Sequence, residues 1–271
     1  MKGALALLLV AAAVPCAAQP RVTGGRLAER PAAGALAAEA RALLTAAADP
    51  AWIAWEAPLA GGRDLTCCCT GPRTAPATGD GRTSARLEPP DTFFVFVRAE
   101  GGRADRVRSF GEGCELEAGG RAVTWLTGVR PAESVAFLEA LAAAPGAPRR
   151  VVAGALSAVA QHGNPEAAPA LLRLARHPDA AVRGAALFRV AQRAGEDAGA
   201  AITEAIANDP ETEVRKRAVF ALSQLPADEG VPRLIEVARS NRNPAVRRQA
   251  MFWLGQSRDA RALAFFEEIL K

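Results

Sequence analysis

The feature that most limits how this chain can fold is an eleven-residue pattern that recurs at an interval of 32 residues. It reads VRGAALFRVAQ from Val182, VRKRAVFALSQ from Val214 and VRRQAMFWLGQ from Val246. An earlier copy, ALSAVAQ from Ala155, matches ALFRVAQ from Ala186 at an interval of 31. Periods of this length with two helices each are typical of helical solenoids, in which each unit buries its apolar face against its neighbours.

On a helical wheel the pattern is apolar on two sides. Val182, Ala186 and Val190 lie within about 80° of one another, which predicts a buried seam. A second side carries phenylalanines in register, at Phe188, Phe220 and Phe252. Because a helix with two apolar sides must be covered twice, the pattern predicts helix pairs that stack on neighbouring pairs. Further helices are expected near residues 165–176, 198–207, 227–239 and 258–270, with caps such as Asn164, Asp209 and Asn243 directly before prolines.

Three segments carry a family resemblance: HPDAAVRGAAL, NDPETEVRKRAVFAL and NPAVRRQAMFWLG resemble HEAT repeats of the short bacterial type, also called phycobilisome-lyase-type HEAT-like repeats. The Val-Arg pair followed by Ala and an apolar residue carries the match, which covers residues 149–271. The resemblance implies an all-α, right-handed solenoid of about four helical pairs. It also implies a scaffold for contact with a protein partner.

The arginine of each Val-Arg pair lies inside the apolar arc, where a guanidinium needs partners. Four residues before these arginines stand an Asp, a Glu and an Asn, so an i,i+4 partner is available in every copy. The pairs are Asp179 with Arg183, Glu211 with Arg215, and Asn243 with Arg247. The resemblance implies that such arginines form a ladder between neighbouring units. We predict a structural role for all six residues, with ligand binding by the arginines as the alternative.

Residues 19–148 are predicted to form an α+β domain, and they resemble no family that we recognise. A helix is expected over residues 34–49, a short strand over 52–56 and a long loop over 61–90. DTFFVFVRAEGGRADRVRSF has the form of a β-hairpin. A second hairpin is expected to join residues 114–117 to 121–126 through Gly119 and Gly120, giving a small antiparallel sheet with a helix from Pro131 behind it.

Residues 1–18 have the features of a secretory signal peptide: one Lys, an apolar run and small residues before Gln19. We expect cleavage near Ala18–Gln19 and a periplasmic or extracellular protein. Lipidation of Cys16 is an alternative, although Pro15 fits poorly before a lipidated cysteine. No later segment approaches the roughly twenty apolar residues that a membrane-spanning helix needs.

The remaining cysteines are Cys67, Cys68, Cys69 and Cys114. In an oxidising compartment the simplest arrangement is a disulfide between Cys114 and one member of the triplet. A reactive thiol is a second interpretation, because Arg63 and Arg73 flank the triplet and can lower a thiol pKa. A metal site is a third, disfavoured because adjacent cysteines lack the spacing of zinc ligands.

The formal net charge of +4 does not indicate a nucleic-acid partner, because acidic residues are interleaved with the arginines and stacking aromatics are lacking. The two histidines, His162 and His177, have no adjacent Glu, so the His-Glu ligand pairs of the di-iron deoxyhypusine hydroxylases, which have related repeats, cannot be transferred. Each is expected to cap an inter-helix turn. No cofactor, metal or catalytic residue is predicted.

The favoured function is a non-catalytic secreted or periplasmic scaffold that binds a protein partner. The alternative is a thiol or disulfide redox role, or another enzymatic role, of Cys67, Cys68 and Cys69. The surface lined by one helix of each pair is the usual docking surface of solenoids. Basic positions recur on the second helices, which suggests an acidic protein segment as the partner. The candidate partner-binding residues are Arg173, Arg176, Arg233 and Arg239.

Overall fold

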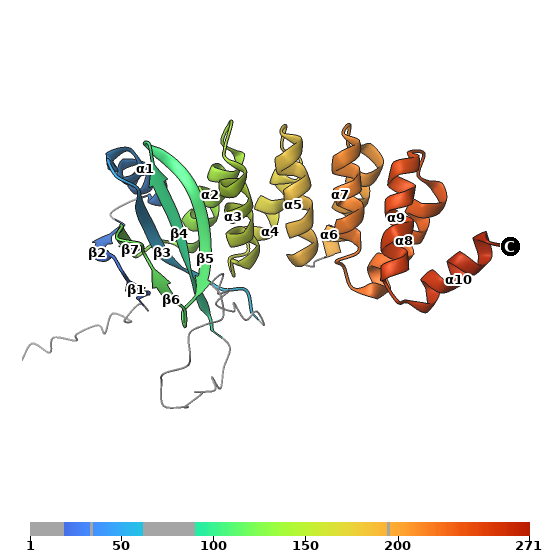
Figure 1. Cartoon of the computed structure of the whole chain (residues 1–271), viewed down its shortest axis with the longest axis horizontal. Helices are drawn as coiled ribbons and strands as arrows, with labels where there is room; N and C mark the ends of the chain where they lie inside the picture. Colours follow the sequence, from blue (N-terminus) through green and yellow to red (C-terminus); the bar gives the residue numbers. More distant parts are fainter. Residues whose placement is uncertain (1–18, 33–34, 62–89, 194–195) are drawn as a thin grey trace, which may run out of the picture.

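The computed structural model describes residues 19–32, 35–61, 90–193 and 196–271 (Figure 1). A β-sheet stands at one end of the molecule, and stacked helices extend from it to the C-terminus. The predicted signal peptide and most of the predicted loop, with Cys67, Cys68 and Cys69, lie outside the described residues.

The sheet region contains two sheets rather than the single antiparallel sheet that was predicted. The five-stranded sheet has the order β2-β7-β3-β4-β5, and a two-stranded sheet pairs β1 with β6. β3 and β5 flank β4 in antiparallel pairs, whereas β7 runs parallel to both β2 and β3. The strands are β1 (Arg21–Thr23), β2 (Arg26–Pro31), β3 (Ala51–Pro58), β4 (Thr92–Glu100), β5 (Arg103–Gly111), β6 (Glu115–Glu117) and β7 (Ala122–Thr127).

The first predicted hairpin is confirmed and the second is wrong. β4 and β5 are joined by Gly101 and Gly102, whose φ angles of 60° and 76° are accessible to glycine without strain. Gly119 and Gly120 also form a turn, but β6 and β7 do not pair with each other. They pair with β1 and β2, for which no strand was predicted. A parallel pair joins distant segments, so no local turn pattern indicates it.

The two helices that precede the repeats both pack against the sheet. They are α1 (Leu36–Ala46), which lies within the predicted range, and α2 (Pro131–Ala143), which begins at Pro131 as predicted. The strand predicted over residues 52–56 is β3, which is longer at both ends. Buried Trp55 of β3 packs edge-on against Phe137, and its Nε1–H donates to Oγ of Ser134 at 2.8 Å, so α2 is held to the sheet by both apolar and polar contacts.

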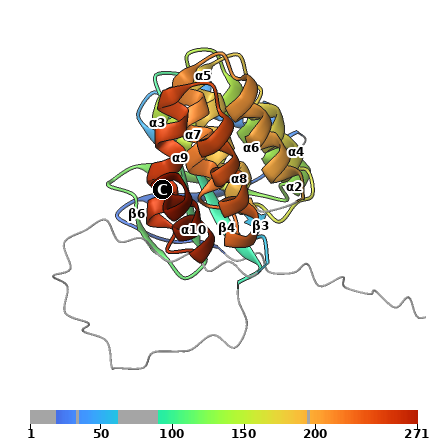
Figure 2. The ribbon, with the colours of Figure 1, turned by 90° about the vertical axis from the view of Figure 1, so that its right-hand side faces the viewer.

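From Arg149 onward the described residues form eight helices, as predicted. We call α3, α5, α7 and α9 the odd row, and α2, α4, α6, α8 and α10 the even row. The even row lies behind the odd row in Figure 1 and beside it in Figure 2, except for α10, which lies past α9 at the C-terminal end of the stack. The helices are α3 (Arg149–Gln161), α4 (Ala167–Leu174), α5 (Ala180–Arg193), α6 (Glu196–Asn208), α7 (Thr212–Leu222), α8 (Ala227–Ser240), α9 (Pro244–Gln256) and α10 (Ala260–Ile269). Handedness stays a prediction.

The apolar seam of the repeat lies in the core, as expected: Val182, Ala186 and Val190 are each at most 5% exposed. The second apolar side is covered in part. The rings of Phe188 and Phe220 stack between neighbouring helices with centroids 5.3 Å apart, whereas Phe252 is 55% exposed. At that end of the stack the ring of Trp253 takes the place next to Phe220, at 4.8 Å.

The sheet and the helical stack share one continuous apolar core. Helix α3 packs so closely on β5 that a Cβ at Gly154 would lie 2.1 Å from the carbonyl oxygen of Val107. Buried Asp105 of β5 binds both Arg98 and Arg150, which adds an ion-pair cluster at the same junction. α2 also contacts α4, so the even row begins before residue 149, where the predicted repeat domain starts. The division into two domains stays a prediction.

Candidate functional site

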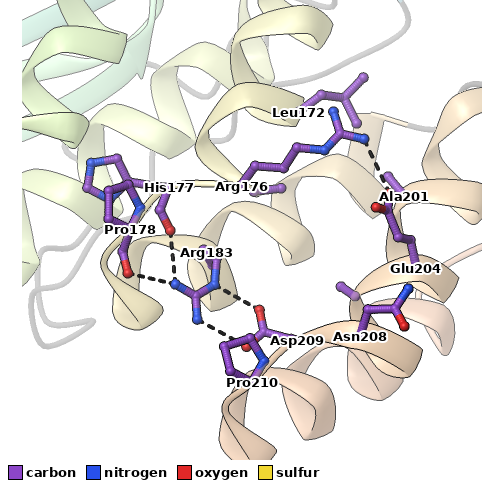
Figure 3. Close-up of a pocket in the computed structure, with 12 residues that line it drawn as sticks. Leu172, Arg176, His177, Pro178, Arg183, Ala201, Glu204, Asn208, Asp209 and Pro210 are labelled. Carbon is purple, nitrogen blue, oxygen red and sulfur yellow. Dashed lines mark hydrogen bonds and ion pairs between the residues drawn. The ribbon is translucent and has the colours of Figure 1, made fainter.

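The arginine of the first full repeat binds the next repeat rather than its own helix. Arg183 donates from Nε and Nη2 to the two carboxylate oxygens of Asp209, at 2.8 and 3.0 Å (Figure 3). Its Nη1 donates to the carbonyl oxygens of His177 and Pro178, at 2.9 and 2.7 Å. The predicted i,i+4 pair with Asp179 is therefore wrong. The Asp179 carboxylate instead accepts the Ala181 N–H at 2.7 Å, at the start of α5.

The other two arginines bind backbone carbonyls and not the predicted partners. Arg215 donates to the carbonyl of Asp209, and Arg247 donates to the carbonyl of Asn241 at 2.7 Å. Glu211 is exposed, and Asn243 caps α9 through the N–H of Ala245. In each copy the arginine donates to the backbone carbonyl of the residue six positions earlier. Helical side chains point back toward the N-terminus of their helix, and the end of the preceding helix lies there with carbonyls that have no partner within that helix.

The Arg183–Asp209 pair is strongly shielded, with side-chain exposures of 12% and 5%. The hydrogen bond to Asp209 raises the pKa of Arg183, so the guanidinium stays charged. Burial by itself raises the pKa of Asp209, but hydrogen bonds from Arg183 and the Glu211 N–H outweigh burial and lower this pKa below its usual value. Both groups are ionised at neutral pH, which makes the pair a fixed link between repeats.

A cavity of about 320 Å³ lies beside this pair, between α4, α5 and α6 (Figure 3). Its two guanidiniums belong to Arg183 and Arg176, and Arg176 is 3.3 Å from the carboxylate of Glu204. Since both cations already bind carboxylates of the protein, an anionic ligand would have to displace one of these partners.

The four predicted partner-binding arginines lie along the even row, and each has an acidic partner in the chain. Arg173 is on α4, Arg176 follows directly after α4, and Arg233 and Arg239 are on α8. Arg173 makes two bonds of 2.7 and 2.8 Å to Glu139 of α2. Arg233 is 3.2 Å from Glu229, while Arg176 and Arg239 bind Glu204 and Glu268 of neighbouring even helices. We call these contacts the even-row ion pairs. They leave little uncompensated positive charge at the predicted docking positions.

The odd row differs in charge pairing. Arg149 of α3, Arg217 of α7 and Arg248 of α9 are exposed, and none of them has a side-chain hydrogen bond or ion pair within the residues that the structure describes. Lys216, the neighbour of Arg217, is 3.0 Å from Glu213. Sequence reasoning missed these three arginines, because the pairing of a surface charge is a property of the folded chain.

A groove of about 480 Å³ lies between α3 and α5 on the odd row. Its apolar walls come from Val152 and Ala153 on one side and from Val182 and Ala185 on the other. Arg149 and Arg217 also line it. The Arg217 side chain crosses α5 over Gly184, where an added Cβ would lie 2.6 Å from Cδ of the arginine. The other copies of the repeat have Lys216 and Arg248 at the position of Gly184.

Both histidines cap turns, as predicted. Nδ1 of His162 accepts the N–H of Asn164 at 3.3 Å, and Nδ1 of His177 accepts the N–H of Asp179 at 3.1 Å. His162 is fully buried, with its ring edge-on to Phe93, and its Nε2 has no hydrogen-bond partner among the described residues. Burial, followed by the charge of Arg193, lowers the pKa of His162 to about 4. His162 is therefore neutral at neutral pH.

The cysteine predictions stay predictions. Cys114 is 2% exposed, but the triplet lies outside the described residues. Within the described ranges no three His, Cys, Asp or Glu side chains are grouped closely enough to hold a metal ion. No helix in the same ranges is long and apolar enough to cross a membrane.

A family model for HEAT repeats matches residues 199–271, so this part of the chain carries HEAT repeats, as predicted. No curated protein matches the sequence. One similar solved structure is the complex of CpcE and CpcF of phycocyanin lyase from Nostoc sp. PCC7120. It shares 18% sequence identity, covers 51% of this chain and 89% of its own, and superposes with a TM-score of 0.41.

Proposed function

We propose that this HEAT-repeat chain is a non-catalytic scaffold that binds a protein partner along the odd row. The observation that carries the proposal is the contrast between the two rows. The odd row has three exposed arginines without partners among the described residues, whereas the predicted docking arginines of the even row are paired. We therefore place the docking surface on the helices that carry the repeated pattern, and not on the second helices, where the sequence had suggested it.

The physical reason is the cost of displacement. A carboxylate from a partner gains little at Arg173, because it replaces a bidentate bond that Glu139 already makes. At Arg149, Arg217 or Arg248 it replaces only water. Unpaired charges on one face also attract an oppositely charged partner at a distance and orient its approach.

Photo-crosslinking in the producing cells tests the proposal. A photoreactive residue is placed at Ala153 or Arg248 on the odd row and, as matched controls, at Thr203 or Glu236 on the even row; all four positions are exposed. A discrete protein adduct from the odd row that is weaker from the even row is the expected result. Equal labelling of both rows contradicts the placement, and absence of protein adducts at all four contradicts the scaffold function.

We also propose that the chain is exported, that it is cleaved near Ala18–Gln19, and that Cys114 forms a disulfide with one residue of the triplet at 67–69. The signal-like sequence of residues 1–18 and the burial of Cys114 support this. Mass spectrometry of the native protein, without reduction, tests both parts. An intact N-terminus contradicts export, and an alkylated Cys114 contradicts the disulfide. A fast-reacting thiol in the triplet would instead support the redox alternative.

A further inference from the structure

The groove between α3 and α5 combines an apolar interior with unpaired positive charge at its rim. Val152 and Val182 in its walls are 8% and 4% exposed, and Ala153 and Ala185 leave room above them. Arg149 is on α3 and Arg217 reaches in from α7. Neither guanidinium has a bonding partner within the described part of the chain.

Arg217 reaches the groove because of one residue of α5. Gly184 has no side chain, so the Cδ and Nη1 atoms of Arg217 occupy positions 2.6 and 2.9 Å from where a Cβ would be. A Lys or Arg, as the other copies have at this position, would clash with Arg217 there and repel its charge. Gly184 thus lets Arg217 reach the rim of this groove, whereas the next repeat has Lys216 in place of the glycine and Gln249 in place of the arginine.

We propose that this groove binds an extended acidic segment of the partner protein, with one apolar side chain between α3 and α5 and flanking carboxylates on Arg149 and Arg217. The inference rests on the scaffold function proposed above and names the site and the chemistry of the bound segment. A volume of about 480 Å³ suits one or two side chains and is too small for a folded element.

The charges that face the groove favour an anionic occupant. Two guanidiniums line it against one carboxylate, that of Asp179. This carboxylate accepts the N–H of Ala181 and forms no ion pair with Arg149 or Arg217 among the described residues. Nδ1 of His177 accepts the N–H of Asp179. The apolar walls require an aliphatic or aromatic side chain, since a polar one would lose hydration without gaining a hydrogen bond there.

Two synthetic peptides test this binding on the full chain: Asp-Glu-Leu-Phe-Glu-Asp and its basic counterpart Lys-Lys-Leu-Phe-Lys-Lys. We expect the acidic peptide to shift the amide NMR signals of Ala153 and Ala185, and the basic peptide to leave them unchanged. Arg149→Glu and Arg217→Glu should each weaken the acidic peptide by about fivefold or more. Arg258→Glu, an equal charge change at an exposed residue outside the groove, is the control.

The results separate this inference from the scaffold function. Equal binding of both peptides, no binding of the acidic peptide, or an unchanged affinity in both groove variants overturns the groove site. Protein adducts at Arg248 would still support the scaffold in that case. Crosslinked adducts at Ala153 should contain an acidic segment of the partner protein. An adduct with a neutral or basic segment, or with a lipid, overturns the inference. Matching thermal melts of the variants exclude loss of folding.

Discussion

Replacing Arg183 by alanine removes a buried link between two repeats. The carboxylate of Asp209, which is 5% exposed in the wild type, keeps only the N–H of Glu211, while the carbonyls of His177 and Pro178 lose their donor. Removing one member of a buried ion pair costs about 3–5 kcal/mol. Since Arg183 is itself 12% exposed, water can reach part of the vacated site. We therefore expect Arg183→Ala to lower the free energy of unfolding by about 3 kcal/mol.

Urea denaturation followed by circular dichroism measures this loss, with Arg248→Ala as the matched control. Arg248 is an exposed arginine of the same row without a partner among the described residues, so its removal should change stability by no more than about 0.5 kcal/mol. If Arg183→Ala costs no more than Arg248→Ala, the ion pair does not link the repeats as argued. The slope of each curve must also be compared, because stacked repeats can unfold in parts.

The pH dependence gives a second test of the same pair. Because the pKa of Asp209 is lowered in the folded state, the ionised carboxylate makes its full contribution to folding stability above the pKa of an unfolded Asp. That contribution is lost as the pH falls through the lower, folded-state pKa. The stability difference between wild type and Arg183→Ala should therefore shrink in acid. A difference that is constant down to strongly acidic pH refutes the electrostatic origin of the effect.

Three further predictions concern contacts elsewhere in the chain. His162 is protonated near pH 6.5 in the unfolded chain but only near pH 4 in the folded chain. The free energy of unfolding of the wild type should therefore fall by about 3 kcal/mol as the pH drops from 6.5 to 4. Urea denaturation at several pH values should show that His162→Asn lacks this loss. Gly154→Ala should lower Tm sharply because its Cβ meets a backbone carbonyl 2.1 Å away, whereas Gly255→Ala, with open space around it, should stabilise α9 by about 1 kcal/mol. Phe220→Ala should cost about 2 kcal/mol in urea denaturation and Phe252→Ala, which is 55% exposed, well under half of that; equal costs would contradict the stacked arrangement.

Local patterns predicted the helices and the first hairpin correctly. The Gly101–Gly102 turn lies between an apolar strand and an alternating one, so both strands and their pairing follow from about twenty neighbouring residues. The Gly119–Gly120 turn has the same signal, yet its strands pair with residues 21–31. Such a choice between a local and a distant partner depends on packing across the whole sheet, which no local pattern contains.

At the candidate site, too, local patterns predicted only part of the arrangement. The positions of Arg183, Arg215 and Arg247 inside the apolar arc predicted that they need partners, and each has one. The predicted partners were the nearest acceptors along the helix. The folded chain offers better ones, because the turn carbonyls are unsatisfied and Asp209 approaches from the next repeat in a shielded position.

The sequence by itself determined that residues 149–271 form stacked helices, because a repeat that is apolar on two sides can bury both only against copies of itself. It also determined which residues lie in the seam. The tertiary structure alone decided which arginines are paired and which remain available to a partner. Ion pairs such as Arg173 with Glu139 and close approaches such as Arg217 over Gly184 join residues far apart in the chain, and their geometry exists only once the helices have stacked.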